Sequence, residues 1–240
     1  RNSGGRIRQP DCMNLYKILF LWLLSDILTG CGGEPTPRLW DIVGKDAFPS
    51  REPLSENNEW KGAPKIGLMV HSDATAPNAA PAIHPEYLQT LTRRTEEFLR
   101  QRCSFQEILT VPPESLPGTF SQELEVQGQR LQVPYVMVVV FSSREQSGPE
   151  KIGEATMMTQ MGGTVVENTG MAEVGILRVS DFTMVFLASG VGTENLELLD
   201  VPLGNNRPSP TEARAIVRAR AGQQALDRVL DHVGLACQRG

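Results

Sequence analysis

The 240-residue chain contains few of the residues that mark the common catalytic and nucleic-acid-binding classes. It has three histidines and four cysteines, and neither H-E-x-x-H nor zinc-finger spacing occurs, which argues against a zinc site. No cluster of five lysines or arginines occurs, the formal net charge is -5, and aromatic residues make up 6% of the chain. The chain therefore lacks the basic surface and the aromatic stacking residues that nucleic-acid binding requires, and we expect no nucleic-acid partner. G-x-S-x-G and S-x-x-K are also absent.

The chain also lacks an apolar run long enough to span a membrane. Its longest one, Ile18 to Gly30, has thirteen residues, which reach about 20 Å as a helix against a hydrocarbon core of about 30 Å. Lys17 precedes the run, as in a secretory signal peptide, whereas Asp26 is an unfavourable charge inside it. We expect a signal peptide, with Met13 as the start of translation and the residues before it as upstream sequence.

Leu28-Thr29-Gly30-Cys31 resembles the bacterial lipobox, the pattern at which lipoprotein signal peptides are lipidated and cut. The resemblance implies that Cys31 is the first mature residue, with a diacylglycerol thioether and an acylated amine. Such chains hold a protein on a membrane because each buried methylene contributes about 0.8 kcal/mol. Gly32, where an aspartate would retain the protein in the inner membrane, implies the outer membrane, facing the periplasm. The alternative is a buried core helix with an incidental cysteine.

The composition divides the chain into three regions. Residues 1–30 hold the upstream extension and the signal peptide, residues 31–64 hold the lipidated cysteine and a Pro-rich tether, and residues 65–240 form one globular domain. A flexible tether of this length spans on the order of 30 Å, so the domain would stand off from the membrane. Trp40 and Trp60 are the tether residues that could dock on the domain.

Strands and helices alternate in the domain. A buried strand is expected at 65–70, a helix opens at His84-Pro85-Glu86, and a second strand covers 105–111. The apolar run 135–141 has no alternation, which indicates a central strand covered on both faces.

A meander of strands 157–166, 172–179 and 183–188 should follow, with turns at 167–170 and 180–181. Residues 191–208 read as an extended polar loop, and Gly190-Val-Gly192 and Gly162-Gly163 as turns or bulges. Ser209 and Glu212 form a capping box that opens the last helix, and Gly234 is its expected C-cap. The predicted fold is α/β (α+β), with a mixed, largely antiparallel sheet and helices packed on one side.

Between Lys65 and Val233 the chain resembles the rhombotarget lipoproteins, and more loosely the α/β periplasmic domain of curli-secretion and penicillin-binding-protein-activator lipoproteins. The resemblance is carried by residues 66–70, 86–112, 135–140, 156–166, 172–182 and 184–190. It implies a non-enzymatic envelope component. A pair of long alternating hairpins, as in the curli-secretion proteins, is not expected here, so pore formation is not carried over.

Two cysteines remain once Cys12 is assigned upstream and Cys31 to the lipid. Cys103 and Cys237 each follow an expected helix, and an exported chain meets an oxidising compartment. Either they form a disulfide that closes a long loop, or they are two free, half-buried thiols.

His71-Ser72-Asp73 places three catalytic residue types at the end of the first strand. Neighbouring strand residues point to opposite faces, so they cannot form a hydrogen-bonded relay. A hydrolase using His71 and Asp73 is the third hypothesis, after the two that follow.

Methionines gather at Met157, Met158 and Met161, followed by Met171. Thioethers can bind Cu(I) in exported proteins, but methionine also fills cores, and a strand would put Met158 on the face opposite Met157 and Met161.

The lipobox, the Pro-rich tether, the α/β domain and the lack of a catalytic set lead to one main hypothesis. The protein is expected to be a non-enzymatic, lipid-anchored envelope protein without a cofactor. It would bind another, unknown protein in a cell-surface assembly or maintenance system. The alternative is a periplasmic lipoprotein that binds Cu(I) or a small molecule.

Overall fold

A computed structural model describes most of the predicted domain and parts of the segment before it. The described residues are 35, 37–43, 60, 63, 65–111, 130–149, 163–199 and 209–238. Cys31, Met157, Met158 and Met161 lie outside them, so the predicted lipidation site and copper ligands have no structural description here.

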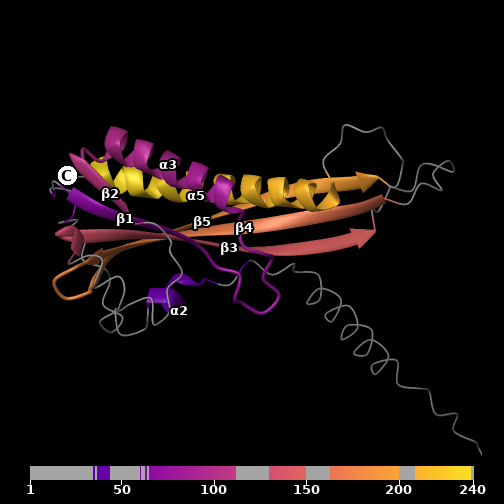
Figure 1. The fold of residues 1–240 in the computed structure, drawn as a ribbon, viewed down its shortest axis with the longest axis horizontal. Helices are drawn as coiled ribbons and strands as arrows, with labels where there is room; N and C mark the ends of the chain where they lie inside the picture. Colours follow the sequence, from indigo (N-terminus) through magenta and orange to yellow (C-terminus); the bar gives the residue numbers. More distant parts are fainter. Residues whose placement is uncertain are drawn as a thin grey trace, which may run out of the picture. The chain divides into compact units, whose positions relative to one another are not determined.

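The described strands form one five-stranded mixed sheet in the order β2-β1-β3-β4-β5 (Figure 1). β1 pairs in parallel with β2 and β3, whereas β3 with β4 and β4 with β5 are antiparallel. The antiparallel pairs are much the longer, which confirms the predicted mixed, largely antiparallel sheet. The strands are β1 (Lys65–Ser72), β2 (Glu107–Val111), β3 (Tyr135–Pro149), β4 (Gly163–Arg178) and β5 (Met184–Leu199).

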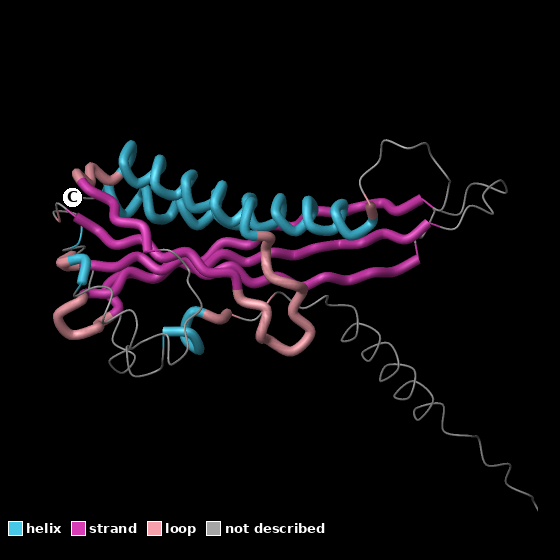
Figure 2. Tube along the Cα trace, viewed as in Figure 1, coloured by secondary structure: helices cyan, strands magenta, loops and turns pink. Residues whose placement is uncertain are grey.

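Two long helices, α3 (Pro85–Arg102) and α5 (Pro210–Gln238), lie together on one face of the sheet (Figure 2). This confirms the predicted helical layer. A short helix, α2 (Leu39–Val43), lies against the opposite face (Figure 1). It falls inside the segment that the sequence assigns to the tether.

Strand alternation divides the core into two hydrophobic layers. In β3, Met137, Val139 and Phe141 pack with α3 and α5, whereas the intervening valines pack on the α2 side. The central strand is therefore buried on both faces, as its continuous apolar run predicts.

Three residues before residue 65 belong to this core. Leu39 and Val43 of α2 are buried on one side of the sheet. Trp60 is buried on the other, with ring centroids 6.0 Å from Phe105 and 5.7 Å from Phe186. Packing thus begins upstream of residue 65, and parts of the segment predicted to be a tether are fixed to the domain.

The turn predicted at residues 167–170 is wrong, because β4 runs through it. Asn168 pairs with Glu145 of β3 and with Glu194 of β5, so strands flank this stretch on both sides. Its asparagine and glycine resemble a turn, but the asparagine is buried and Gly170 lies under the backbone of α5. Tertiary packing overrides the local signal.

The polar loop predicted from Val191 is also wrong at its start, since β5 continues to Leu199. With β3 and β4 it forms antiparallel hairpins of fifteen and sixteen residues per strand, so the expectation that long hairpins are absent is corrected too. Gly190 and Gly192 are strand residues that face α5, rather than a turn.

The capping box at the start of α5 is confirmed. The Ser209 N–H donates to Glu212 Oε2 at 2.7 Å, and the Glu212 N–H donates to Ser209 Oγ at 3.3 Å. Gly234 is not the C-cap, because the helix continues to Gln238. A Cβ at Gly234 would lie 3.0 Å from Phe98 Cζ, so this glycine lets α3 approach α5.

Replacing Ser209 with alanine should destabilise the domain by about 1 kcal/mol, since an N-terminal N–H of the helix loses its side-chain acceptor. Urea unfolding of the purified domain would measure the change. Ser209→Asp keeps an acceptor and should restore most of the stability, while Thr211→Ala, in the same exposed turn, should have little effect. Equal losses from Ser209→Ala and Thr211→Ala would contradict the capping role.

Candidate functional site

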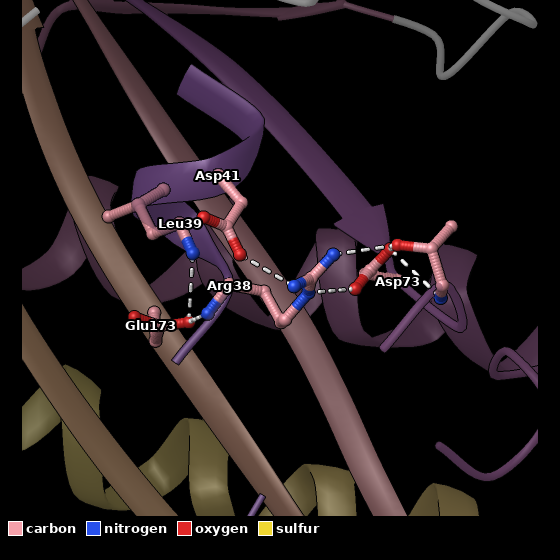
Figure 3. Close-up of polar contacts among 6 residues, drawn as sticks. Arg38, Leu39, Asp41, Asp73 and Glu173 are labelled. Carbon is pink, nitrogen blue, oxygen red and sulfur yellow. Dashed lines mark hydrogen bonds and ion pairs between the residues drawn. The ribbon is translucent and has the colours of Figure 1, made fainter. Parts of the chain in front are cut away.

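The most elaborate polar cluster in the described residues joins α2 to the sheet, and we call it the clamp: Arg38, Asp41, Asp73, Thr75 and Glu173 (Figure 3). The Arg38 side chain donates through Nε to Asp73 Oδ2 at 2.7 Å and through Nη2 to Thr75 Oγ1 at 2.8 Å. Its Nη1 lies 2.6 Å from Asp41 Oδ2. One guanidinium thus ties the start of α2 to the residues that follow β1.

Glu173 supplies the second half of the clamp. It lies in the middle of β4, faces the α2 side and is only 3% exposed. Its Oε2 accepts hydrogen bonds from the backbone N–H groups of Arg38 at 2.5 Å and Leu39 at 3.0 Å. These N–H groups lie at the first turn of α2, where a helix has no internal acceptors, so the buried carboxylate completes the helix start.

The two buried carboxylates of the clamp respond differently to their surroundings. Burial raises the pKa of Glu173, and the two backbone N–H groups and Arg38 offset only part of this effect. Burial also favours the neutral form of Asp73, but hydrogen bonds from Thr75 and Arg38 outweigh it and hold the pKa of Asp73 below its usual value. Asp73 is therefore held as an anion that balances Arg38, whereas burial favours the neutral form of Glu173.

Glu173 should make stability depend on pH in a defined direction. Its pKa is higher in the folded than in the unfolded chain, so the folded state binds more protons between the two values. The stabilisation that Glu173 contributes to the free energy of unfolding is fully present below its pKa in the unfolded chain. It is lost as the pH rises through its pKa in the folded chain. Wild type should therefore lose stability relative to Glu173→Gln as pH rises from about 4.5.

Urea unfolding of wild type and Glu173→Gln at a series of pH values from about 4.5 to 7.5 would measure this difference. Gln keeps a carbonyl oxygen for the two N–H groups of α2 but does not titrate. Glu167→Gln, at an exposed position of the same strand, is the matched control and should follow wild type. Parallel pH profiles for wild type and Glu173→Gln would contradict the burial effect.

The clamp also accounts for part of His71-Ser72-Asp73. Asp73 is occupied by Arg38 and Thr75, and the Ser72 hydroxyl accepts a hydrogen bond from the Ile83 N–H at 2.8 Å. Burial lowers the pKa of His71. Asp73 and Ser72 thus hold the chain in place after β1.

Cys103 and Cys237 form a disulfide with a Cα–Cα separation of 5.1 Å. Cys103 is the C-cap of α3, while Cys237 lies in the last turn of α5 and not beyond it. The bridge joins the ends of the two long helices. Within the described part of the chain, no three His, Cys, Asp or Glu side chains gather as a metal site would require.

A second polar group, which sequence reasoning did not find, lies under the first half of α5. Glu145, Asn168 and Glu194 form a row across three strands. Arg218 Nη2 of α5 lies 3.3 Å from Glu145 Oε2, and Gln224 donates to Glu194 at 2.8 Å. The fully buried amide of Asn168 has no protein hydrogen-bond partner within the described residues. Polar contacts therefore accompany the buried alanines and Val217 in this half of the helix packing.

β5 forms one edge of the described sheet, so one side of its backbone has no described strand beside it. Arg228 of α5 donates to the Val191 carbonyl, which places the backbone groups of Val191 on this outer side. Because these groups alternate in direction along a strand, those of Ser189 and Thr193 point outward as well. Both residues are exposed. β5 therefore offers the backbone groups of Ser189 and Thr193 to a further strand, whereas Arg228 occupies the Val191 carbonyl between them.

Natural edge strands usually carry lysine, proline or a bulge that prevents pairing with other chains. β5 contains neither lysine nor proline, and residues 184–193 include no charged residue. The register irregularity of its pairing with β4 lies at its first residues, where Val185 is skipped, so residues 186–199 pair without a break. Several of its apolar side chains are only partly buried, among them Phe186, Leu187 and Val191. A long, uncharged edge of this kind is suited to binding another protein chain.

Comparisons with known proteins give distant structural likenesses only. No family model and no curated protein matches the chain. A Helicobacter pylori protein described as a neuraminyllactose-binding hemagglutinin homologue is 8% identical, with a TM-score of 0.43, over 75% of this chain and 92% of that one. Lipoprotein GNA1162 from Neisseria meningitidis is 10% identical, with a TM-score of 0.27, over 66% and 96%. A minor lipoprotein from Acinetobacter baumannii is 10% identical, with a TM-score of 0.32, over 71% and 92%.

With TM-scores below 0.5, these likenesses carry no argument about function, which we draw from the residues of this chain. The resemblance to rhombotarget lipoproteins stays a prediction. In the described residues, no helix combines the length and apolarity needed to cross a membrane.

Proposed function

We propose that the protein is a non-enzymatic, lipid-anchored component of the bacterial envelope that binds another protein through the outer edge of β5. The observation that carries the proposal is the edge itself: a sixteen-residue strand with outward-facing backbone groups and no charge from residue 184 to 193. In strand addition, main-chain hydrogen bonds supply affinity and alternating side chains supply specificity.

Membrane attachment in this proposal rests on the lipobox that ends at Cys31. Palmitate labelling followed by membrane fractionation tests it, with Cys31→Ala as the control. We expect wild type to be labelled and to sediment with outer membranes, as Gly32 favours, and the variant to be unlabelled and soluble. A wild-type chain that stays unlabelled and soluble would refute the anchor.

Binding at the edge can be tested by photo-cross-linking in intact membranes. A benzophenone amino acid at Ser189 should give a discrete adduct, whereas the same probe at Gln89, on the exposed surface of α3, should not. The adduct should disappear on Thr193→Pro, because proline removes an outward N–H without removing a bond to β4. Thr193→Ala, which keeps that N–H, should retain the adduct.

Two outcomes would overturn binding at the edge. One is the absence of a Ser189 adduct, and the other is an adduct that persists in a folded Thr193→Pro variant. An adduct with twice the mass of the chain, lost on Thr193→Pro, would support the proposal and identify the partner as a second copy.

A further inference from the structure

We infer that the face of the domain that carries α2 lies directly against the lipid bilayer, with Trp40 at the membrane–water interface. The inference rests on the proposed lipidation of Cys31 and names the orientation that this anchor imposes. It replaces the predicted picture of a domain that stands off on a tether of 33 residues.

Chain length limits the separation between lipid and domain. Pro35 is already buried, only four residues after Cys31. Four extended residues reach about 14 Å. The thioether of a lipidated cysteine lies where acyl chains meet the headgroups, so Pro35 must lie within about 14 Å of that boundary.

The clamp makes α2 a rigid part of the domain. Two backbone N–H groups at the start of α2 are bound to the buried Glu173, and Arg38 is bound to Asp73. Leu39 and Val43 are buried beneath the helix, so α2 cannot leave the sheet without exposing them. Because residue 35 is held near the membrane and α2 is fixed to the sheet, the anchor determines the orientation of the whole domain.

Trp40 has the chemistry of an interfacial residue. It is 38% exposed, nine residues after Cys31. Tryptophan is enriched at membrane–water interfaces because its ring is apolar and its N–H is polar. The charged residue beside it on α2, Asp41, is turned toward Arg38, with Oδ2 2.6 Å from Arg38 Nη1.

The second large exposed apolar side chain in the described residues, Leu235, is 50% exposed and provides an internal control. It belongs to α5, which lies on the opposite face of the sheet from α2 (Figure 1). A domain held by its α2 face should keep residue 235 away from the lipid.

Quenching of tryptophan fluorescence by brominated phospholipid tests the orientation. The mature lipoprotein would contain two tryptophans, Trp40 and the buried Trp60. In vesicles brominated near the headgroup end of the acyl chains, wild type should lose most of its Trp40 emission. Trp40→Phe, which reports Trp60 alone, should be unquenched. Trp40→Phe with Leu235→Trp should be unquenched as well.

The outcomes separate this inference from the anchor on which it rests. Unquenched wild type that floats with the vesicles would overturn the orientation and leave the anchor intact. Equal quenching at residues 40 and 235 would also overturn it, because the domain would then have no fixed face toward the bilayer. Wild type that fails to float, as Cys31→Ala should, would overturn the anchor and the orientation together.

Discussion

Removing the disulfide should lower the free energy of unfolding by about 4 kcal/mol, the largest loss that we expect from any change described here. Cys103 and Cys237 are 134 residues apart in sequence, and closing so long a loop restricts the unfolded chain strongly. The bridge also joins the last turn of α5 to the C-cap of α3, where the two helices pack together.

Urea unfolding of Cys103→Ala/Cys237→Ala against oxidised wild type would measure this loss. Cys237→Ala alone should cost nearly as much as the double variant, because either change breaks the same bond. Wild type treated with a thiol reductant should move in the same direction. A double variant that loses less than about 1 kcal/mol would contradict a stabilising role for the bridge.

The parts of the fold that sequence could predict depend on local signals. The capping box at Ser209 and Glu212 is such a signal, since both partners lie within one turn. The central strand is another, because its uninterrupted apolar run is short for a helix and rich in valine. Both were correct, and with them the fold class.

The clamp was missed because its partners are distant in sequence. Arg38 and Glu173 are 135 residues apart, and a glutamate in a strand usually indicates a solvent-facing position. The one local clue is Leu39 to Val43, where Leu39, Ile42 and Val43 have the spacing of one helix face in an otherwise Pro-rich stretch. Five residues are too few to establish a helical period, so the sequence alone predicts a tether here.

The edge of the sheet was missed for a related reason. Glycine, serine and threonine in residues 189–193 have the composition of a loop, although they lie in β5. Their strand conformation depends on pairing with β4, and the close approach of α5 requires glycine at residues 190 and 192. Small residues occur both in turns and in strands that pack closely under a helix, and the sequence alone does not distinguish these two cases.

The two halves of α5 are held by different forces. Its C-terminal half packs through Leu226, Val229 and Val233 and ends at the disulfide. Its N-terminal half crosses the polar row of Glu145, Asn168 and Glu194. Apolar burial and a covalent bond resist opening more strongly than partly exposed ion pairs. Close backbone contact with β5 is therefore important for keeping the first half of the helix on the sheet.

Gly192→Ala tests that contact, and we expect it to lower the free energy of unfolding by about 2–3 kcal/mol. A Cβ at residue 192 would lie 2.4 Å from the Ala221 carbonyl oxygen and 2.7 Å from the Ala225 backbone nitrogen. Both are backbone atoms of α5, so no side-chain rotation can relieve the overlap and the helix must move away from the strand. This loss from steric overlap should exceed the stabilisation of about 0.5–1 kcal/mol that alanine provides over glycine in a strand.

Urea unfolding would again supply the measurement, with Thr193→Ala as the matched control. Thr193 is the next residue of the same strand but is exposed on the other face, so its replacement should cost little. Hydrogen exchange provides a second readout, because a displaced helix should lose protection near Ala221 and keep it near Val233, beyond the contact. Gly192→Ala with the stability and exchange of wild type would show that β5 and α5 do not depend on this close approach.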